Sequence, residues 1–220
     1  MTQLEIEIGL LKKEVTDMWN LVIMQLDKAR TALMQFDKNL AREVVLKERR
    51  VNGHELKIDR DCENIFALLT PVAIDLRFVL AVLKINSNLE RTGDIAEGIA
   101  KHIILSEQSF STKVLEATNL IKMYDEAISM LEDALAAFER EDTELARSVF
   151  KKDEFLDHIN ENANETVARI IKDIPQEMDT ALNILSIIRK LERVGDQSKN
   201  MAEEIIFYVE AKVLKHRNTH

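Results

Sequence analysis

The hexapeptide LERTGD at Leu89–Asp94 returns as LERVGD at Leu191–Asp196, 102 residues further along a chain of 220 residues. Five of the six positions are identical, and the segments around both copies have the apolar spacing of helices. A motif that recurs in this way is typical of an internal duplication. We therefore expect two similar halves, each built from helices.

The composition favours long helices. The chain has only 5 Gly and 2 Pro, and aromatic residues make up 5% of it. With 46% hydrophobic and 31% charged residues, it has the composition of a globular protein with a proper core. We predict an all-α protein with no sheet.

Charge and cysteine usage exclude several classes of protein. The net charge of −9 disfavours a nucleic-acid partner, since phosphates would be repelled. The single Cys62 rules out an intrachain disulfide and suits a reducing compartment. We find neither a signal-peptide pattern nor an apolar run long enough to span a membrane. The expected location is the cytoplasm.

Helix punctuation divides the chain into six segments. Asp37 and Asp142 stand where N-caps are expected, and Pro71 and Pro175 mark turns. The tract SEQSFST, residues 106–112, is the most loop-like segment. We expect helices over residues 1–36, 40–69, 75–105, 113–139, 143–172 and 177–215. They would form two tandem three-helix bundles with spectrin-repeat-like helices, residues 1–108 and 109–220.

Pairs of acids four residues apart occur on the second and third helices of each half. We align residues 54–59 with residues 152–157, and the hexapeptide supplies the pairs on the third helices. The candidate metal ligands are Glu55, Asp59, Glu90, Asp94, Asp153, Asp157, Glu192 and Asp196. All eight continue the apolar stripes of their helices, so they are expected to face the seams between helices.

The hairpin geometry brings these acids together. Glu55 and Glu90 are equally far from the first turn, as are Asp153 and Glu192 from the second, so each half gathers four carboxylates at one level. Oxygen ligands suit hard cations, and we expect Mg²⁺, Mn²⁺, Ca²⁺ or iron. The competing interpretation is a surface ladder of acids with Lys and Arg partners.

The glycines and arginines of the hexapeptide bear on the same site. Gly93 and Gly195 lie in mid-helix, where glycine costs about 1 kcal/mol relative to alanine. They indicate close helix approach or exposed backbone near the acids, unless they are a relic of the duplication. Arg91 and Arg193 point about 100° away from the acids and would neutralise only part of them.

The remaining motifs carry little chemistry. The five His residues show no HExxH spacing, and no glycine-rich phosphate loop is present. The first helix has an apolar face that would support a homodimer, or else belongs simply to the core. Its apolar residues are Leu10, Leu11, Met18, Trp19, Leu21 and Val22.

Two stretches carry a family resemblance. Residues 51–102, VNGHELKIDRDCENIFALLTPVAIDLRFVLAVLKINSNLERTGDIAEGIAKH, resemble the PhoU family of phosphate-signalling regulators. Residues 185–211, LSIIRKLERVGDQSKNMAEEIIFYVEA, are similar to the matching second repeat. The resemblance implies two three-helix bundles with metal clusters on their acidic faces. It also implies that the eight candidate acids, Glu55, Asp59, Glu90, Asp94, Asp153, Asp157, Glu192 and Asp196, are the metal ligands. Two positions depart from the family pattern. Thr92 stands where Ile or Val is commoner, and Asp153 stands where Glu is frequent.

The resemblance also implies a function. It predicts a cytoplasmic regulator, peripheral to the membrane through its partners, that represses the phosphate-starvation response when phosphate is plentiful. The implied partners are the ATPase subunit of a phosphate ABC transporter and a sensor histidine kinase. Two alternatives stay open. One is an accessory protein of a different phosphate transporter. The other is a di-iron bundle enzyme, which needs Glu-x-x-His pairs, whereas Ile58 and Gly93 stand three residues after the key acids.

Overall fold

The computed structural model describes residues 2–214, and every regular element within them is a helix. The first repeat comprises α1–α3 and the second α4–α7, joined by residues 106–111. The elements are α1 (Gln3–Gln35), α2 (Lys38–Leu69), α3 (Ala73–Leu105), α4 (Thr112–Ala117), α5 (Leu120–Arg140), α6 (Thr143–Asp173), the short 3₁₀ turn η1 (Pro175–Glu177) and α7 (Met178–Glu210). The all-α prediction and the two tandem repeats are confirmed, and the expected border after residue 108 falls in the joining segment.

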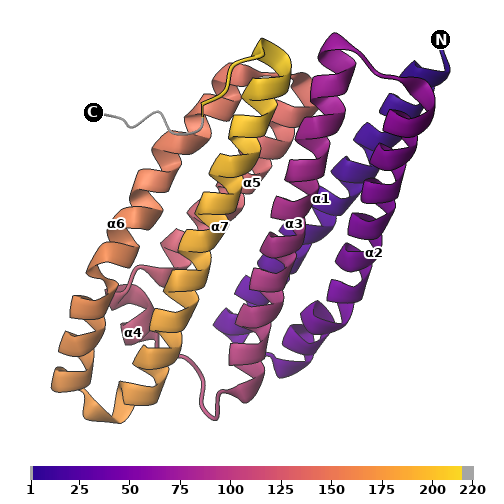
Figure 1. Ribbon diagram of the computed structural model, residues 1–220. Coiled ribbons are helices and arrows are strands. Elements are labelled where there is room, and N and C mark those ends of the chain that lie inside the picture. Colours follow the sequence, from indigo (N-terminus) through magenta and orange to yellow (C-terminus); the bar gives the residue numbers. More distant parts are fainter. Residues whose placement is uncertain (1, 215–220) are drawn as a thin grey trace.

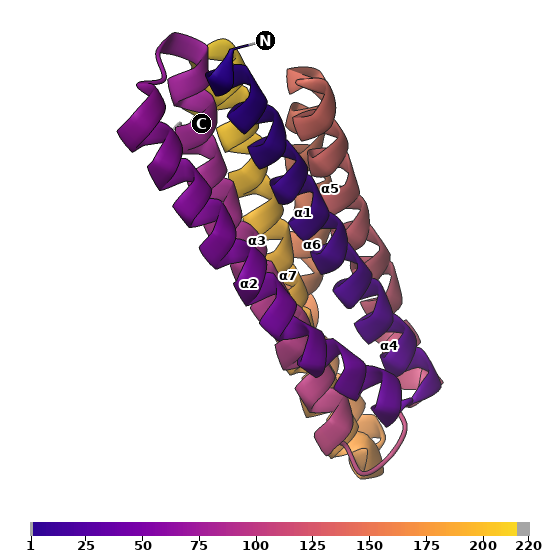
Figure 2. The same ribbon diagram turned by 90° about the vertical axis from the view of Figure 1, so that its right-hand side faces the viewer.

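The long helices form two layers of an elongated molecule. α6, α7, α3 and α2 lie side by side in one layer (Figure 1). The quarter turn of Figure 2 shows α1 and α5 in a second layer, α1 against α2 and α3, α5 against α6 and α7. α3 and α7 run antiparallel at the centre, where Lys84 Nζ lies 2.9 Å from Glu204 Oε2. A pseudo-twofold axis between α3 and α7 therefore relates the repeats.

The two repeats share one hydrophobic core. Phe138 of α5 stacks on Phe78 of α3 with ring centroids 6.0 Å apart, and its ring lies 5.8 Å from that of Trp19 on α1. Trp19 is fully buried, and its Nε1 donates to Leu131 O of α5 at 3.1 Å. A buried aromatic side chain contributes about 2–3 kcal/mol, so these contacts hold the bundles together as one body.

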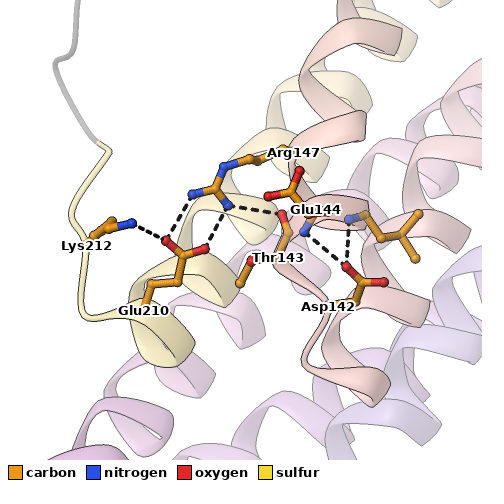
Figure 3. Close-up of polar contacts among 7 residues, drawn as sticks. Asp142, Thr143, Glu144, Arg147, Glu210 and Lys212 are labelled. Atoms are coloured by element: carbon orange, nitrogen blue, oxygen red, sulfur yellow. Dashed lines mark hydrogen bonds and ion pairs between the residues drawn. The ribbon is translucent and has the colours of Figure 1, made fainter.

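Capping residues begin the helices where the sequence indicates. Asp37 Oδ1 accepts hydrogen bonds from two backbone N–H groups at the start of α2, and Asp142 Oδ1 does the same at the start of α6 (Figure 3). Both caps satisfy donors that a helix start leaves free. One turn after the second cap, Arg147 forms a two-pronged ion pair with Glu210 at 3.0 Å, which ties the end of α7 to the start of α6 (Figure 3).

Two helices differ from the sequence-based expectation. The helix expected over 113–139 is broken at Asn119, whose φ of 53° is left-handed, so α4 and α5 are separate. Just before the break, Thr118 Oγ1 donates a hydrogen bond to Val114 O at 2.8 Å. α7 ends at Glu210 because Ala211 adopts a left-handed φ of 56°. The end expected at residue 215 lies outside the described residues.

The apolar face of α1 is covered within the chain. The chain's own helices α2, α3 and α5 pack against α1 and bury Leu11, Met18, Trp19 and Val22. Of the apolar residues that suggested a homodimer, only Leu10 is exposed, at 58%. This face is core, as the simpler interpretation held, and the homodimer stays a prediction without support from α1.

Candidate functional site

The register between the two repeats differs from our alignment of residues 54–59 with 152–157. The caps Asp37 and Asp142 are equivalent, and the sequence Leu-Ala-Arg follows each of them at the same distance. This offset of 105 residues makes Glu48 the counterpart of Asp153. The alignment was wrong by two helical turns.

The motif glycines confirm the corrected register. A Cβ on Gly93 would lie 3.1 Å from Glu48 Oε2, and a Cβ on Gly195 would lie 2.7 Å from Asp153 Oδ1. Each glycine thus lets α3 or α7 approach a buried carboxylate on the neighbouring helix, as the close-approach interpretation predicted. The offset falls from 105 to the 102 residues of the hexapeptides for two reasons: residues 70–72 connect α2 to α3 whereas Ile174 alone separates α6 from η1, and α6 ends at Asp173, one residue before the counterpart of Leu69.

Glu48, which the sequence analysis missed, is the most deeply buried acid of the first repeat. It is 5% exposed, and burial together with the nearby Asp94 raises its pKa to about 7. Gln25 Nε2 of α1 approaches Glu48 Oε2 at 3.5 Å, while Glu48 Oε1 is buried with no hydrogen-bond partner. The residue could have been found from Asp37, since it stands as far from that cap as Asp153 stands from Asp142.

The four predicted ligands of the first repeat lie on α2 and α3 around Glu48: Glu55, Asp59 and Glu90 are partly buried, whereas Asp94 is exposed. Burial raises the pKa of Glu90, and the carboxylates of Asp94 and Glu55 raise it further. Burial, Asp59 and Asp94 likewise raise the pKa of Glu55. Asp59 Oδ1 accepts a hydrogen bond from Asn86 Nδ2 at 2.9 Å. We call Glu48, Glu55, Asp59, Glu90 and Asp94 the first acidic cluster.

The predicted ligands of the second repeat gather on the α6–α7 seam around a lysine. Asp153 is 3% exposed, and its Oδ2 is ion-paired with Lys199 Nζ. Lys199 Nζ also lies 3.1 Å from Asp196 Oδ1. Burial raises the pKa of Glu192, and the charges of Asp196, Asp157 and Asp153 add to that rise. We call Asp153, Asp157, Glu192 and Asp196 the second acidic cluster.

Carboxylates suit a hard cation, but the two clusters differ in how well they fit one. Among residues 2–214, no three His, Cys, Asp or Glu side chains converge closely enough to hold a metal ion without moving. Each buried acid keeps one oxygen without a hydrogen-bond partner, Glu48 Oε1 in the first cluster and Asp153 Oδ1 in the second. In the first cluster the mutual repulsion of the acids favours an added cation. The second cluster already contains an ammonium group, so the residues there do not fit a metal equally well.

The hexapeptide arginines lie outside both seams. Arg91 and Arg193 line a groove of about 290 Å³ between α3 and α7, together with Lys190 and Asp94. Gly93 follows Lys84 by nine residues and Gly195 precedes Glu204 by nine, so the two glycines lie level in these antiparallel helices. The arginines therefore separate two acidic clusters at the same height, and the ion pairs of residues 2–214 do not include them.

Within residues 2–214, Cys62 is not an activated nucleophile. Cys62 is fully buried, and burial raises the pKa of its thiol to about 12, which keeps it protonated and unreactive. His54 Nδ1 lies 2.6 Å from Glu14 Oε1, on the α1–α2 side of the bundle. Within the described part of the chain, no helix is long and apolar enough to cross a membrane.

Comparisons with known proteins agree with this architecture. The model of the PhoU domain matches the chain twice, over residues 15–103 and 120–205. The phosphate-specific transport system accessory protein PhoU of Edwardsiella tarda is 32% identical over 97% of this chain and 87% of its own length. Its namesake from Escherichia coli is 30% identical over 97% of this chain and 88% of its own.

Solved structures extend the likeness to the fold. The crystal structure of PhoU from Pseudomonas aeruginosa superposes with a TM-score of 0.90 and 31% identity, covering 96% of this chain and 100% of that one. The phosphate transport system regulatory protein PhoU from Streptococcus pneumoniae gives a TM-score of 0.87 at 29% identity, over 96% of this chain and 99% of that one. Both repeats and their arrangement are therefore shared with these proteins.

Proposed function

The chain belongs to the PhoU family, and from that membership we propose that it is an accessory protein of a phosphate transport system that regulates phosphate uptake. The observation that carries this proposal is the match of the PhoU domain to both repeats, in a chain that relatives named as transport accessory proteins cover almost completely. In this role the protein keeps the phosphate-starvation response off while phosphate is plentiful.

The proposed mode of action is docking rather than catalysis. The two clusters consist of carboxylates, with Asn86 and Gln25 beside the first and Lys199 beside the second, and the buried Cys62 offers no thiolate. No His stands three residues after their acids in the Glu-x-x-His spacing of di-iron enzymes. The layer of α6, α7, α3 and α2 offers a broad helical face to a partner (Figure 1). We propose that the protein binds two partners in the cytoplasm, the ATPase subunit of a phosphate ABC transporter and a sensor histidine kinase.

We further propose that the first acidic cluster binds a hard cation, Mg²⁺, Mn²⁺, Ca²⁺ or iron. Glu48 and Asp94 would hold it together with Glu90, after side-chain rotations that bring their oxygens together. A buried acid that lies beside other acids and has one unpaired oxygen is costly when ionised, and a cation next to Glu48 would offset that cost. Glu55 and Asp59 lie further along the same seam and complete its negative potential.

The regulatory role is tested by deletion and replacement. Deleting the gene in phosphate-replete cells should turn on starvation-responsive genes and raise phosphate uptake. Wild-type protein should reverse both effects. The variant Glu90→Gln, Asp94→Asn tests whether the first acidic cluster takes part. Unchanged gene expression and uptake after a clean deletion would refute the regulatory role. Cross-linking and affinity capture then distinguish the proposed partners from a different phosphate transporter.

A further inference from the structure

Lys199 stands at the position where the first repeat has an acid. Residues of α3 and α7 correspond at the hexapeptide offset, so Lys199 is the counterpart of Glu97. Glu97 pairs with Lys101 on its own helix at 2.6 Å, and its charge helps to raise the pKa of Glu48. Lys199 points instead at the carboxylates of its own repeat. One substitution thus reverses the sign of the charge beside the buried acid.

The ammonium group of Lys199 bridges two helices. It pairs with Asp153 of α6 and lies 3.1 Å from Asp196 of α7. Its side chain is 28% exposed and that of Asp153 is 5% exposed, so the pair is shielded from solvent. Burial opposes the charge of Lys199, but the hydrogen bond and charge of Asp153 outweigh it and raise its pKa. Carboxylates from two different helices thus hold one ammonium group.

The surroundings of the two buried acids differ as well. Glu48 is approached by the polar Gln25 of α1, whereas the α5 residue near the buried acid of the second repeat is Met130, whose Cε lies 3.7 Å from the Cβ position of Gly195. The methionine offers the carboxylate no hydrogen bond, so Lys199 is the strongest partner that Asp153 has. Without that lysine, the second cluster would contain four acids and no internal cation. It would then resemble the first cluster in charge.

We propose that Lys199 is a built-in cation that takes the place of a metal ion in the second repeat, so that the second acidic cluster is closed to metal. A divalent ion would have to displace an ammonium group that two carboxylates already hold, and place two positive charges beside it. The two repeats have thus diverged in function. The expectation that the wild-type chain has one metal site rests on the metal site proposed for the first repeat. The proposed role of Lys199 does not depend on that site.

Metal-binding experiments on the full-length protein test this assignment. The starting protein carries Glu90→Gln and Asp94→Asn, which disable the first cluster, and is stripped of metal before equilibrium dialysis against Mn²⁺. It should retain no stoichiometric Mn²⁺. Adding Lys199→Met should create a site for about one Mn²⁺ per chain, because the four acids lose their internal cation. Mn²⁺ should also raise the melting temperature of that variant and leave the starting protein unchanged.

Two further variants keep the test sharp. Lys13→Met removes the same charge from an exposed position of α1 and should create no site. Lys199→Glu restores the acid that the first repeat has at this position, and replaces the methionine variant if that protein does not fold. Stoichiometric Mn²⁺ in the starting protein would overturn the proposal, as would folded Lys199 variants that gain no metal. A wild-type protein without metal would instead refute the first site while leaving the role of Lys199 intact.

Discussion

Replacing Gly195 by alanine measures how closely α6 and α7 approach each other. The new Cβ would lie 2.7 Å from Asp153 Oδ1 and 2.8 Å from Leu156 Cδ2, closer than such atoms can stand. Neither neighbour moves freely, since Leu156 is fully buried and Asp153 is held by Lys199. Overpacking a core costs about 1–3 kcal/mol, and the better helix propensity of alanine returns about 1 kcal/mol. With contacts this short we place the overpacking cost near the upper end, so Gly195→Ala should destabilise the fold by about 1–2 kcal/mol.

Gly53→Ala is the matched control. Gly53 lies in mid-helix on α2 with no atom within 4 Å of its Cβ position, so alanine should stabilise the protein by about 0.5–1 kcal/mol. Gly93→Ala should fall between the two, because its shortest contacts, to Glu48 Oε2 and Val51 Cγ1, are 3.1 Å and need a shift of only a few tenths of an ångström. A gap of about 2 kcal/mol between the outer variants corresponds to about 4–8 °C in melting temperature for a chain of this size.

Urea unfolding followed by circular dichroism at 222 nm gives the three stabilities directly. The order of stability should be Gly53→Ala, wild type, Gly93→Ala, then Gly195→Ala, with the third close to the second. A Gly195→Ala protein as stable as the Gly53→Ala protein would refute the reasoning. It would mean that the contacts at the α6–α7 seam relax without cost.

Three further changes have expected outcomes. The pKa of Glu48 rises to about 7 from 4.5 on folding, so its ionisation costs stability as pH rises between these values, and the full cost applies above pH 7. In metal-free protein, Glu48→Gln should therefore stabilise by about 1–3 kcal/mol at pH 8 and by much less at pH 5, which unfolding curves at both pH values check. Trp19→Phe should cost about 1–3 kcal/mol by removing the buried hydrogen bond to Leu131 O and leaving a void beside Phe138, measured by chemical denaturation. Asp142→Ala should cost about 1 kcal/mol by removing the cap of α6, with faster amide exchange in the first turn of α6 but not of α2.

Much of the fold followed from local patterns. The repeated hexapeptide predicted the duplication, and the scarcity of Gly and Pro predicted long helices. Asp37 and Asp142 marked helix starts correctly because an N-cap bonds only to residues two or three positions away. The breaks at Asn119 and Ala211 were missed. A left-handed alanine such as Ala211 carries no sequence signal, since alanine is the strongest helix former.

The sequence by itself determined that acids would line the α2–α3 and α6–α7 seams, because helical periodicity places residues four apart on one face. It did not determine which acids meet. Glu48 escaped notice and residues 54–59 were aligned with the wrong segment, although the equal distances from the caps Asp37 and Asp142 carry the correct alignment. Which acids meet across a seam depends further on the connecting turn and on interlocking side chains, which the sequence does not show. The partnership of Lys199 with Asp153 joins residues 46 positions apart and exists only once α6 and α7 pack together. Periodicity along one helix thus reveals which face a charge occupies, whereas the tertiary structure alone decides which opposite charge it meets.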